Sequence, residues 1–144
     1  MIKAEDLRIG DIVIVSKTGC MIPKGTVCRV TAIDSESSLF EDRIGSVRLI
    51  PIDPKRKQIS WSVWCKNISP IPLTPEILEK NGWKRDKLVA YIYGHEAHNI
   101  EVICTPNSEW MYVTFKGETI HRIKYVHELQ HILWALGLDA NLKI

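Results

Sequence analysis

The sequence predicts an α+β protein built from two small units. Short segments in the first 65 residues alternate apolar with polar side chains between Gly, Pro and charged turns, as half-buried antiparallel strands do. A linker at residues 68–73 then contributes two prolines, which favour an extended path. Near residue 125 the apolar spacing becomes helical. We therefore predict one unit over residues 1–72 and a second over residues 73–144, packed against the first.

The N-terminal unit is predicted to be an SH3-like small β-barrel. In its second segment, Cys28 and Val30 share one face while Arg29 takes the other, which is the alternation of a strand. About 65 residues leave no room for a helix between strands of this length, so a small barrel is the expected architecture. The strands are expected over residues 11–17, 26–34, 45–53 and 59–65.

The C-terminal unit is predicted to run helix, antiparallel meander, helix. Thr74 is placed to cap the first helix, with Pro75 at its first position and Asn81-Gly82 at its end. A tight turn at residues 116–117 joins the last two strands of the meander. The strands are expected over residues 87–93, 99–104, 110–115 and 118–124.

The final helix is expected over residues 125–136, stopped by Gly137, and it carries two stripes of side chains. A wide apolar stripe is predicted to lie on the sheet. It comprises Tyr125, Val126, Leu129, Ile132, Leu133 and Leu136. The opposite side lacks the Glu, Lys and Gln of a solvated face, so we predict that it binds a protein partner, the barrel or a second copy of the chain. This narrower stripe comprises His127, His131, Trp134 and Leu138.

Composition sets limits on function. The 144 residues are 45% hydrophobic and 25% charged, the balance of a globular chain that buries a core and not of a disordered one. No apolar run approaches the roughly 20 residues that span a bilayer, and the N-terminus has no apolar signal core, so we expect a cytoplasmic protein without a membrane partner. The four cysteines form no C-x-x-C pair, and we expect them to be reduced.

Charge makes nucleic-acid binding a weak alternative. The formal net charge is +2, too small to attract nucleic acid strongly. The first 72 residues hold 11 basic and 8 acidic side chains, so any basic surface belongs to the N-terminal half. Lys55, Arg56 and Lys57, together with Trp61, could grip a phosphate and stack on a base. The simpler interpretation is a solvated loop tip beside a tryptophan of the barrel core.

One motif carries chemistry, the sequence His127-Glu128-Leu129-Gln130-His131. On a helix, two imidazoles at i and i+4 can share Zn²⁺ while the intervening Glu128 acts as general base. A catalytic zinc needs a third protein ligand, and Asp139 is the only His or acidic residue that follows.

Other metal ligands are available only upstream. Cys104 or His121 could serve as the third ligand of the helix, and His95 and His98 form a separate pair in the segment of residues 94–99, which could fold over one end of the last helix. No complete set is visible. We therefore predict surface or interface histidines without a cofactor, with a zinc-dependent hydrolase as the alternative.

Three segments carry a family resemblance. DLRIGDIV at the start, IPLTPEILEKNGW in the middle and YVHELQHILWALGL at the end resemble, in that order, a family of small uncharacterised proteins of Bacteroidales and of their prophages and mobile elements. The resemblance implies a phage or mobile-element context and no particular activity. Because no catalytic set is complete, we predict a non-enzymatic binding or accessory protein that engages a protein partner or itself.

Overall fold

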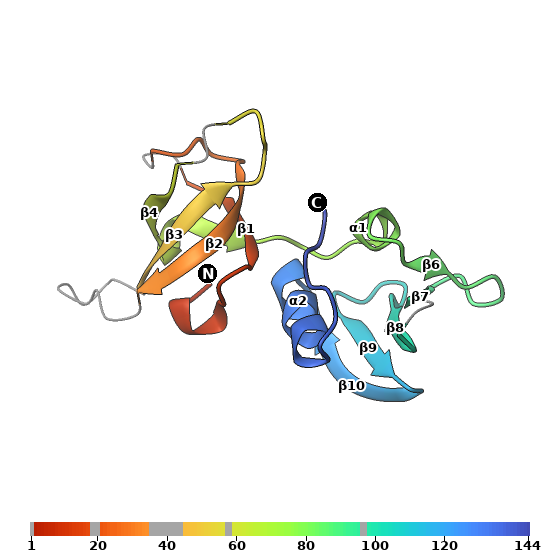
Figure 1. The fold of residues 1–144 in the computed structure, drawn as a ribbon. Coiled ribbons are helices and arrows are strands. Elements are labelled where there is room, and N and C mark those ends of the chain that lie inside the picture. Colours follow the sequence, from red (N-terminus) through yellow and green to blue (C-terminus); the bar gives the residue numbers. More distant parts are fainter. Residues whose placement is uncertain (1, 18–20, 35–44, 57–58, 96–97) are drawn as a thin grey trace. The chain divides into compact units, whose positions relative to one another are not determined.

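A computed structural model describes residues 2–17, 21–34, 45–56, 59–95 and 98–144. The chain divides into two compact units, Met1–Ile71 and Pro72–Ile144, and each is described here by itself. The model is α+β, with one antiparallel sheet in each unit (Figure 1). None of the helices in the described ranges is long and apolar enough to cross a membrane.

The N-terminal unit is a five-stranded antiparallel sheet in the order β4-β3-β2-β1-β5. Its elements are η1 (Ala4–Asp6), β1 (Ile12–Val15), β2 (Val27–Asp34), β3 (Ser46–Pro51), β4 (Trp61–Trp64), η2 (Cys65–Asn67) and β5 (Ile68–Pro70). The first four strands lie where the alternation predicted them. Inward-facing side chains such as Val13, Val30 and Leu49 are fully buried and form the core of this unit.

The predicted closed barrel is not formed by the described strands. β4 and β5 are the two edges of the sheet, and no described residues pair these edges with each other. The linker prediction also needs correction, because Ile68–Pro70 is a strand that pairs with β1, with Pro70 opposite Val13. Proline is tolerated there because an edge strand has a side without ladder hydrogen bonds. An SH3-like relationship stays a prediction.

The C-terminal unit is a second five-stranded antiparallel sheet, in the order β10-β9-β8-β7-β6, with two helices. Tyr93, Val102 and Val113 lie side by side on β7, β8 and β9, and all three are buried. Figure 1 shows α2 beside β9 and β10. The elements are α1 (Pro75–Lys80), β6 (Lys84–Arg85), β7 (Ile92–His95), β8 (Ile100–Ile103), β9 (Met111–Phe115), β10 (Glu118–Ile123) and α2 (Val126–Ala135).

The strand predicted at residues 87–93 is wrong. One carboxylate oxygen of Asp86 accepts hydrogen bonds from the backbone N–H groups of Leu88 and Val89, both at 2.7 Å. These bonds lower the pKa of Asp86 and close a turn, because a short acidic side chain can bond the backbone two or three residues on. The strand therefore starts at Ile92, after the turn.

The predicted turn and helix signals are confirmed. Thr74 caps α1, with its hydroxyl accepting a hydrogen bond from the N–H of Ile77 at 3.4 Å. Lys116 and Gly117 have φ values of 52° and 84°, the left-handed pair that a two-residue hairpin turn requires.

The last helix is slightly shorter than predicted. α2 begins at Val126 and ends at Ala135. Val126, Leu129 and Leu133 are buried as the wide stripe predicts, whereas Ile132 and Leu136 are only half-buried. Two residues of the predicted apolar stripe, Ile132 and Leu136, therefore lie outside the fully buried face of the helix.

Candidate functional site

Glu128 of the H-E-x-x-H motif is held at the start of α2. Its Oε2 atom accepts hydrogen bonds from the backbone N–H groups of Lys124 at 2.6 Å and Tyr125 at 2.9 Å. Glu128 is the third residue of the helix, the position from which a glutamate reaches back to the N-terminal backbone in a capping box. The carboxylate that the zinc hypothesis makes a general base is therefore committed to capping.

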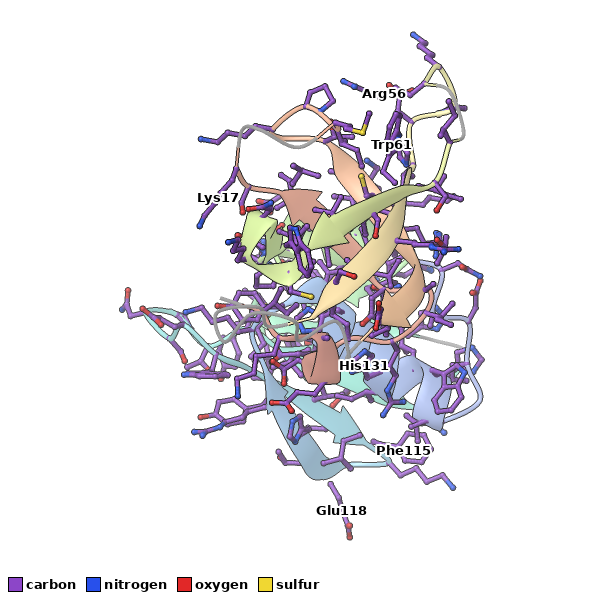
Figure 2. The ribbon with its side chains drawn as sticks, turned by 90° about the vertical axis from the view of Figure 1, so that its left-hand side faces the viewer. Lys17, Arg56, Trp61, Phe115, Glu118 and His131 are labelled. Atoms are coloured by element: carbon purple, nitrogen blue, oxygen red, sulfur yellow. The ribbon has the colours of Figure 1, made fainter. Side chains whose placement is uncertain are left out.

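The two histidines of the motif belong to an aromatic cluster. His127 is 5% exposed and stacks on Tyr125, with ring centroids 5.9 Å apart and an angle of 15° between the planes. His127 also meets the ring of His131 edge to face, with centroids 5.6 Å apart. Figure 2 shows His131 on the helix, where it is half-buried. Within the described ranges, no three His, Cys, Asp or Glu side chains gather closely enough to share a metal ion.

The proposed upstream ligands differ in their surroundings. The Cys104 thiol follows β8 and lies 3.5 Å from the Sδ atom of Met111. Burial raises the pKa of Cys104 to about 11, so the thiol stays protonated at neutral pH, whereas zinc binds the thiolate. His121 is exposed on β10. Zinc binding at the motif therefore stays an untested hypothesis.

A pocket lies at the C-terminal ends of the two helices, and we call it the C-terminal pocket. Its volume of about 520 Å³ falls within the range of small-ligand and side-chain pockets. It brings together three predicted candidates, His95, His98 and Leu138, so the histidine pair does lie near the end of the last helix. Its lining comprises Lys80, Asn81, Gly82, Trp83, His95, His98, Leu133, Leu138, Asp139, Asn141, Leu142 and Lys143.

The end of α1 forms one wall of this pocket. The N–H of Gly82 donates to the carbonyl of Glu79 at 3.0 Å, and the N–H of Trp83 donates to the carbonyl of Leu78 at 3.1 Å. This pair of bonds is a Schellman motif, which needs a left-handed residue, and Gly82 has φ of +82°. The motif turns the chain so that Trp83 is 2% exposed and lines the pocket.

The end of α2 repeats the same motif. The N–H of Gly137 donates to the carbonyl of Trp134 at 3.0 Å, and the N–H of Leu138 donates to the carbonyl of Leu133 at 2.8 Å. Gly137 has φ of +72°. Leu138 occupies the position that Trp83 occupies after α1, and both residues line the pocket. The two helix ends are therefore equivalent in construction.

This geometry divides the predicted partner-binding stripe. Leu138 lies beyond the helix and lines the C-terminal pocket, so it does not continue the helical spacing of the other three residues. His127 is buried and His131 half-buried, whereas 67% of Trp134 is exposed. Trp134 is thus the most exposed member of the stripe.

The histidine pair of the pocket is stacked. The rings of His95 and His98 are 4.9 Å apart with 19° between their planes, and Trp83 meets His95 edge to face at 5.4 Å. The nitrogen lone pairs of an imidazole lie in its ring plane, so stacked rings hold them in two nearly parallel planes and not toward one metal ion between the rings. The pair therefore forms an aromatic wall in this structure and not a chelate.

Asn81 holds in place the segment after α2, which forms another wall of the C-terminal pocket. Its side-chain Nδ2 donates to the carbonyl of Lys143 at 2.8 Å, and its Oδ1 accepts from the N–H of Lys143 at 2.7 Å. Nδ2 also donates to the carbonyl of Ile77 at 2.7 Å. One side chain thereby ties the segment after α2 to the end of α1. Sequence reasoning identified Asn81 only as a helix stop, because the partner segment lies 62 positions away.

A second, smaller pocket lies in the N-terminal unit. Arg56 and Trp61 lie at the same end of this unit (Figure 2), and Trp61 packs partly on the core. Asp53 lies 4.0 Å from the Arg56 guanidinium and accepts a hydrogen bond from the N–H of Lys55, which offsets part of the basic charge. Lys57 lies outside the described residues. The pocket, of about 220 Å³, is lined by Met21, Ile22, Pro23, Pro51, Arg56 and Trp61.

Comparison with known proteins adds no assignment. No protein-family model, curated protein or solved structure matches this chain.

Proposed function

We propose that this protein is a non-enzymatic binding or accessory protein of a phage or mobile element, and that it engages a protein partner through the C-terminal end of α2. The observation that carries the proposal is the 67% exposure of Trp134. The family resemblance supports the phage or mobile-element context. We propose a cytoplasmic setting and retain the SH3-like relationship of the N-terminal unit as part of the same hypothesis.

The energetics of Trp134 support binding to a protein. Large aromatic side chains are mostly buried, and tryptophan is enriched among the residues that dominate binding energy at interfaces. Covering the exposed part of Trp134 is worth on the order of 2–3 kcal/mol, which is enough to anchor a contact. The C-terminal pocket, which Leu133 and Leu138 line, offers a partner a second feature at the same end of α2.

The alternatives gain no comparable support. A zinc hydrolase needs Glu128 as base, and that carboxylate caps its own helix. Nucleic-acid binding needs an open basic patch, but in the patch around Arg56 the carboxylate of Asp53 lies 4.0 Å from the guanidinium and offsets part of its charge. Both stay alternative hypotheses.

The proposal is tested by site-specific photo-crosslinking of the full chain in cells that encode it. A photoreactive phenylalanine analogue replaces Trp134 in one variant and Leu88 in a control, because Leu88 is 94% exposed in the same unit. We expect a discrete protein adduct from position 134 and none from position 88. No adduct from 134, or the same adducts from both positions, would contradict the proposal.

A further inference from the structure

We propose that the C-terminal pocket binds a small aromatic carboxylate, which is a flat apolar ring that carries one negative charge. All described residues of its lining belong to the second unit of the chain, and its volume of about 520 Å³ is in the range of small-molecule sites. Trp134 does not line this pocket. The site is therefore separate from the protein contact proposed at Trp134 and goes beyond that function.

The buried part of the lining is apolar, and the exposed part carries charge. The nearly fully buried lining residues are Trp83, Leu133 and Leu142. The exposed charged lining residues are Lys80, Asp139 and Lys143. A ligand that suits such a lining has an apolar body, which covers the buried side chains, and a charged group, which stays at the exposed edge.

The aromatic residues of the lining favour a ring as the apolar body. His95 and His98 stack with ring centroids 4.9 Å apart, and Trp83 meets His95 edge to face. Aromatic side chains pair with a further ring, at centroid distances of about 4.5–7 Å, more favourably than the buried area alone provides. The pocket should therefore prefer an aromatic body to an aliphatic chain of similar size.

The bonding groups at the two helix ends do not favour a cation. The C-terminal end of a helix attracts positive charge through carbonyl groups that lack a hydrogen bond. Here the carbonyls of Leu78 and Leu133 accept from the N–H groups of the two Schellman motifs. The carbonyl of Ile77 accepts from the side chain of Asn81. The helix ends therefore present little of the negative partial charge that would attract a cation.

The charged side chains favour an anion. The described lining holds two ammonium groups, of Lys80 and Lys143, against the single carboxylate of Asp139. That carboxylate already accepts two hydrogen bonds from Asn141 through Oδ1, both at 2.9 Å. Among the described residues, the Nζ atom of Lys143 has no hydrogen-bond or ion-pair partner, while Asn81 fixes the backbone of Lys143. A ligand carboxylate at the exposed edge would gain a charge-assisted hydrogen bond from Lys143.

Isothermal titration calorimetry of the full chain with three probes tests the chemical class. Naphthoate carries the ring and the charge, naphthylmethanol carries the ring alone, and octanoate carries the charge on a flexible aliphatic chain. We expect naphthoate to bind one to one, about tenfold more tightly than naphthylmethanol and more tightly than octanoate, because each of these lacks one of the two contacts. No binding of naphthoate, or an equal affinity for either of the other probes, would overturn the proposal.

Variants of opposite expected sign test whether the probe lies in this pocket. Lys143→Met should weaken naphthoate binding by about tenfold. Lys87→Met is the matched control, because it removes the same charge from an exposed position outside the pocket, and it should leave the affinity unchanged. Asp139→Asn removes the lining carboxylate but keeps an oxygen for Asn141, so it should tighten binding roughly two- to fivefold, a gain that a folding defect does not produce.

Equal effects of the two lysine variants, or weaker binding to Asp139→Asn, would place the probe elsewhere and overturn the proposal. None of these results depends on crosslinking from position 134, so the proposed function is tested separately.

Discussion

The two ends of α2 differ in how exposed their side chains are, and the sequence motif does not predict this difference. The N-terminal end holds the H-E-x-x-H motif, yet His127 is buried and Glu128 is engaged by two backbone N–H groups. The C-terminal end has no motif, yet Trp134 is exposed there, and Leu133 and Leu138 line a pocket built from three chain segments. The residue types that could carry out chemistry lie at the N-terminal end of α2, whereas the exposed aromatic side chain lies at its C-terminal end.

The difference teaches how a helix can generate a catalytic pattern for structural reasons. A glutamate at the third helical position is favoured because it satisfies N–H groups that the first turn leaves unbonded. A residue just before it and one three positions after it share a side of the helix, so two aromatic rings there pack together. The capping bonds of Glu128 and the contact between His127 and His131 thus give this H-E-x-x-H a structural role.

Among substitutions that test this difference between the two ends of α2, we expect the largest loss of unfolding free energy at Glu128. Glu128→Ala removes the acceptor for the N–H groups of Lys124 and Tyr125, and loss of a charged cap of this kind costs about 2 kcal/mol of unfolding free energy. Denaturant unfolding measures the change. The control is Glu118→Ala, because Glu118 is exposed at the start of β10, where Figure 2 labels it, and the change there should stay within about 0.5 kcal/mol.

The zinc hypothesis makes the opposite prediction for Glu128. A general base contributes to reaction and not to folding, so its removal would leave stability unaltered while abolishing a zinc-dependent hydrolysis. If Glu128→Ala leaves the unfolding free energy unchanged, the capping role of Glu128 is wrong, and the H-E-x-x-H motif is again a candidate catalytic site.

A smaller effect is expected at the two glycines that end the helices. Gly82→Ala and Gly137→Ala place a Cβ on a backbone with positive φ, and each should cost about 1 kcal/mol of unfolding free energy. Neither new Cβ meets an atom within 4 Å, so the cost is conformational and not steric. Gly94→Ala is the matched control, because its surroundings are also open and its φ is not in the left-handed range.

The two glycine variants also probe the pocket. Because Gly137 orients Leu138 and Gly82 orients Trp83, both substitutions should disturb the pocket that these two residues line, whereas Gly94→Ala should not. Destabilisation by Gly94→Ala equal to that of the other two would show that the Schellman motifs carry no special role.

Local signals explain which parts of the fold the sequence could predict. Thr74 and Pro75 cap and start a helix through their own hydrogen bonds and φ preference, so neighbours a few residues away are sufficient. The apolar content of residues 87–93 predicts a strand, but the Asx-type turn at Asp86 is an equally local signal and delays the strand to Ile92. Whether the first sheet closes into a barrel depends on pairing between its distant edge strands, which the alternation within each strand does not encode.

The candidate site was predictable only in pieces. His95 and His98 could be noticed because they are close in sequence, and Leu138 because it extends a helical spacing. Trp83 and Asn81 were missed, since their role depends on the segment after α2 returning to α1. The visible signal, in retrospect, is the repeated pattern of a leucine four residues before a glycine that is followed by a large apolar residue, at Leu78 to Trp83 and Leu133 to Leu138.

The smallest expected effect concerns Cys104, the upstream ligand of the zinc hypothesis. Burial raises the pKa of its thiol from an ordinary value of 9.0 to about 11. Between these values the folded chain retains a proton that the unfolded chain has lost, so this group's stabilising contribution is complete below pH 9 and declines as the pH rises toward 11. Cys104→Ala should therefore show a shallower fall in unfolding free energy over this interval than wild type does. Urea unfolding at pH 8 and pH 10 gives the comparison, and taking the difference between the two proteins cancels the lysines and tyrosines that titrate in the same range. Equal slopes would mean that the thiol is as easily ionised as an exposed one, which would make Cys104 a better metal ligand and strengthen the zinc alternative at the N-terminal end of α2.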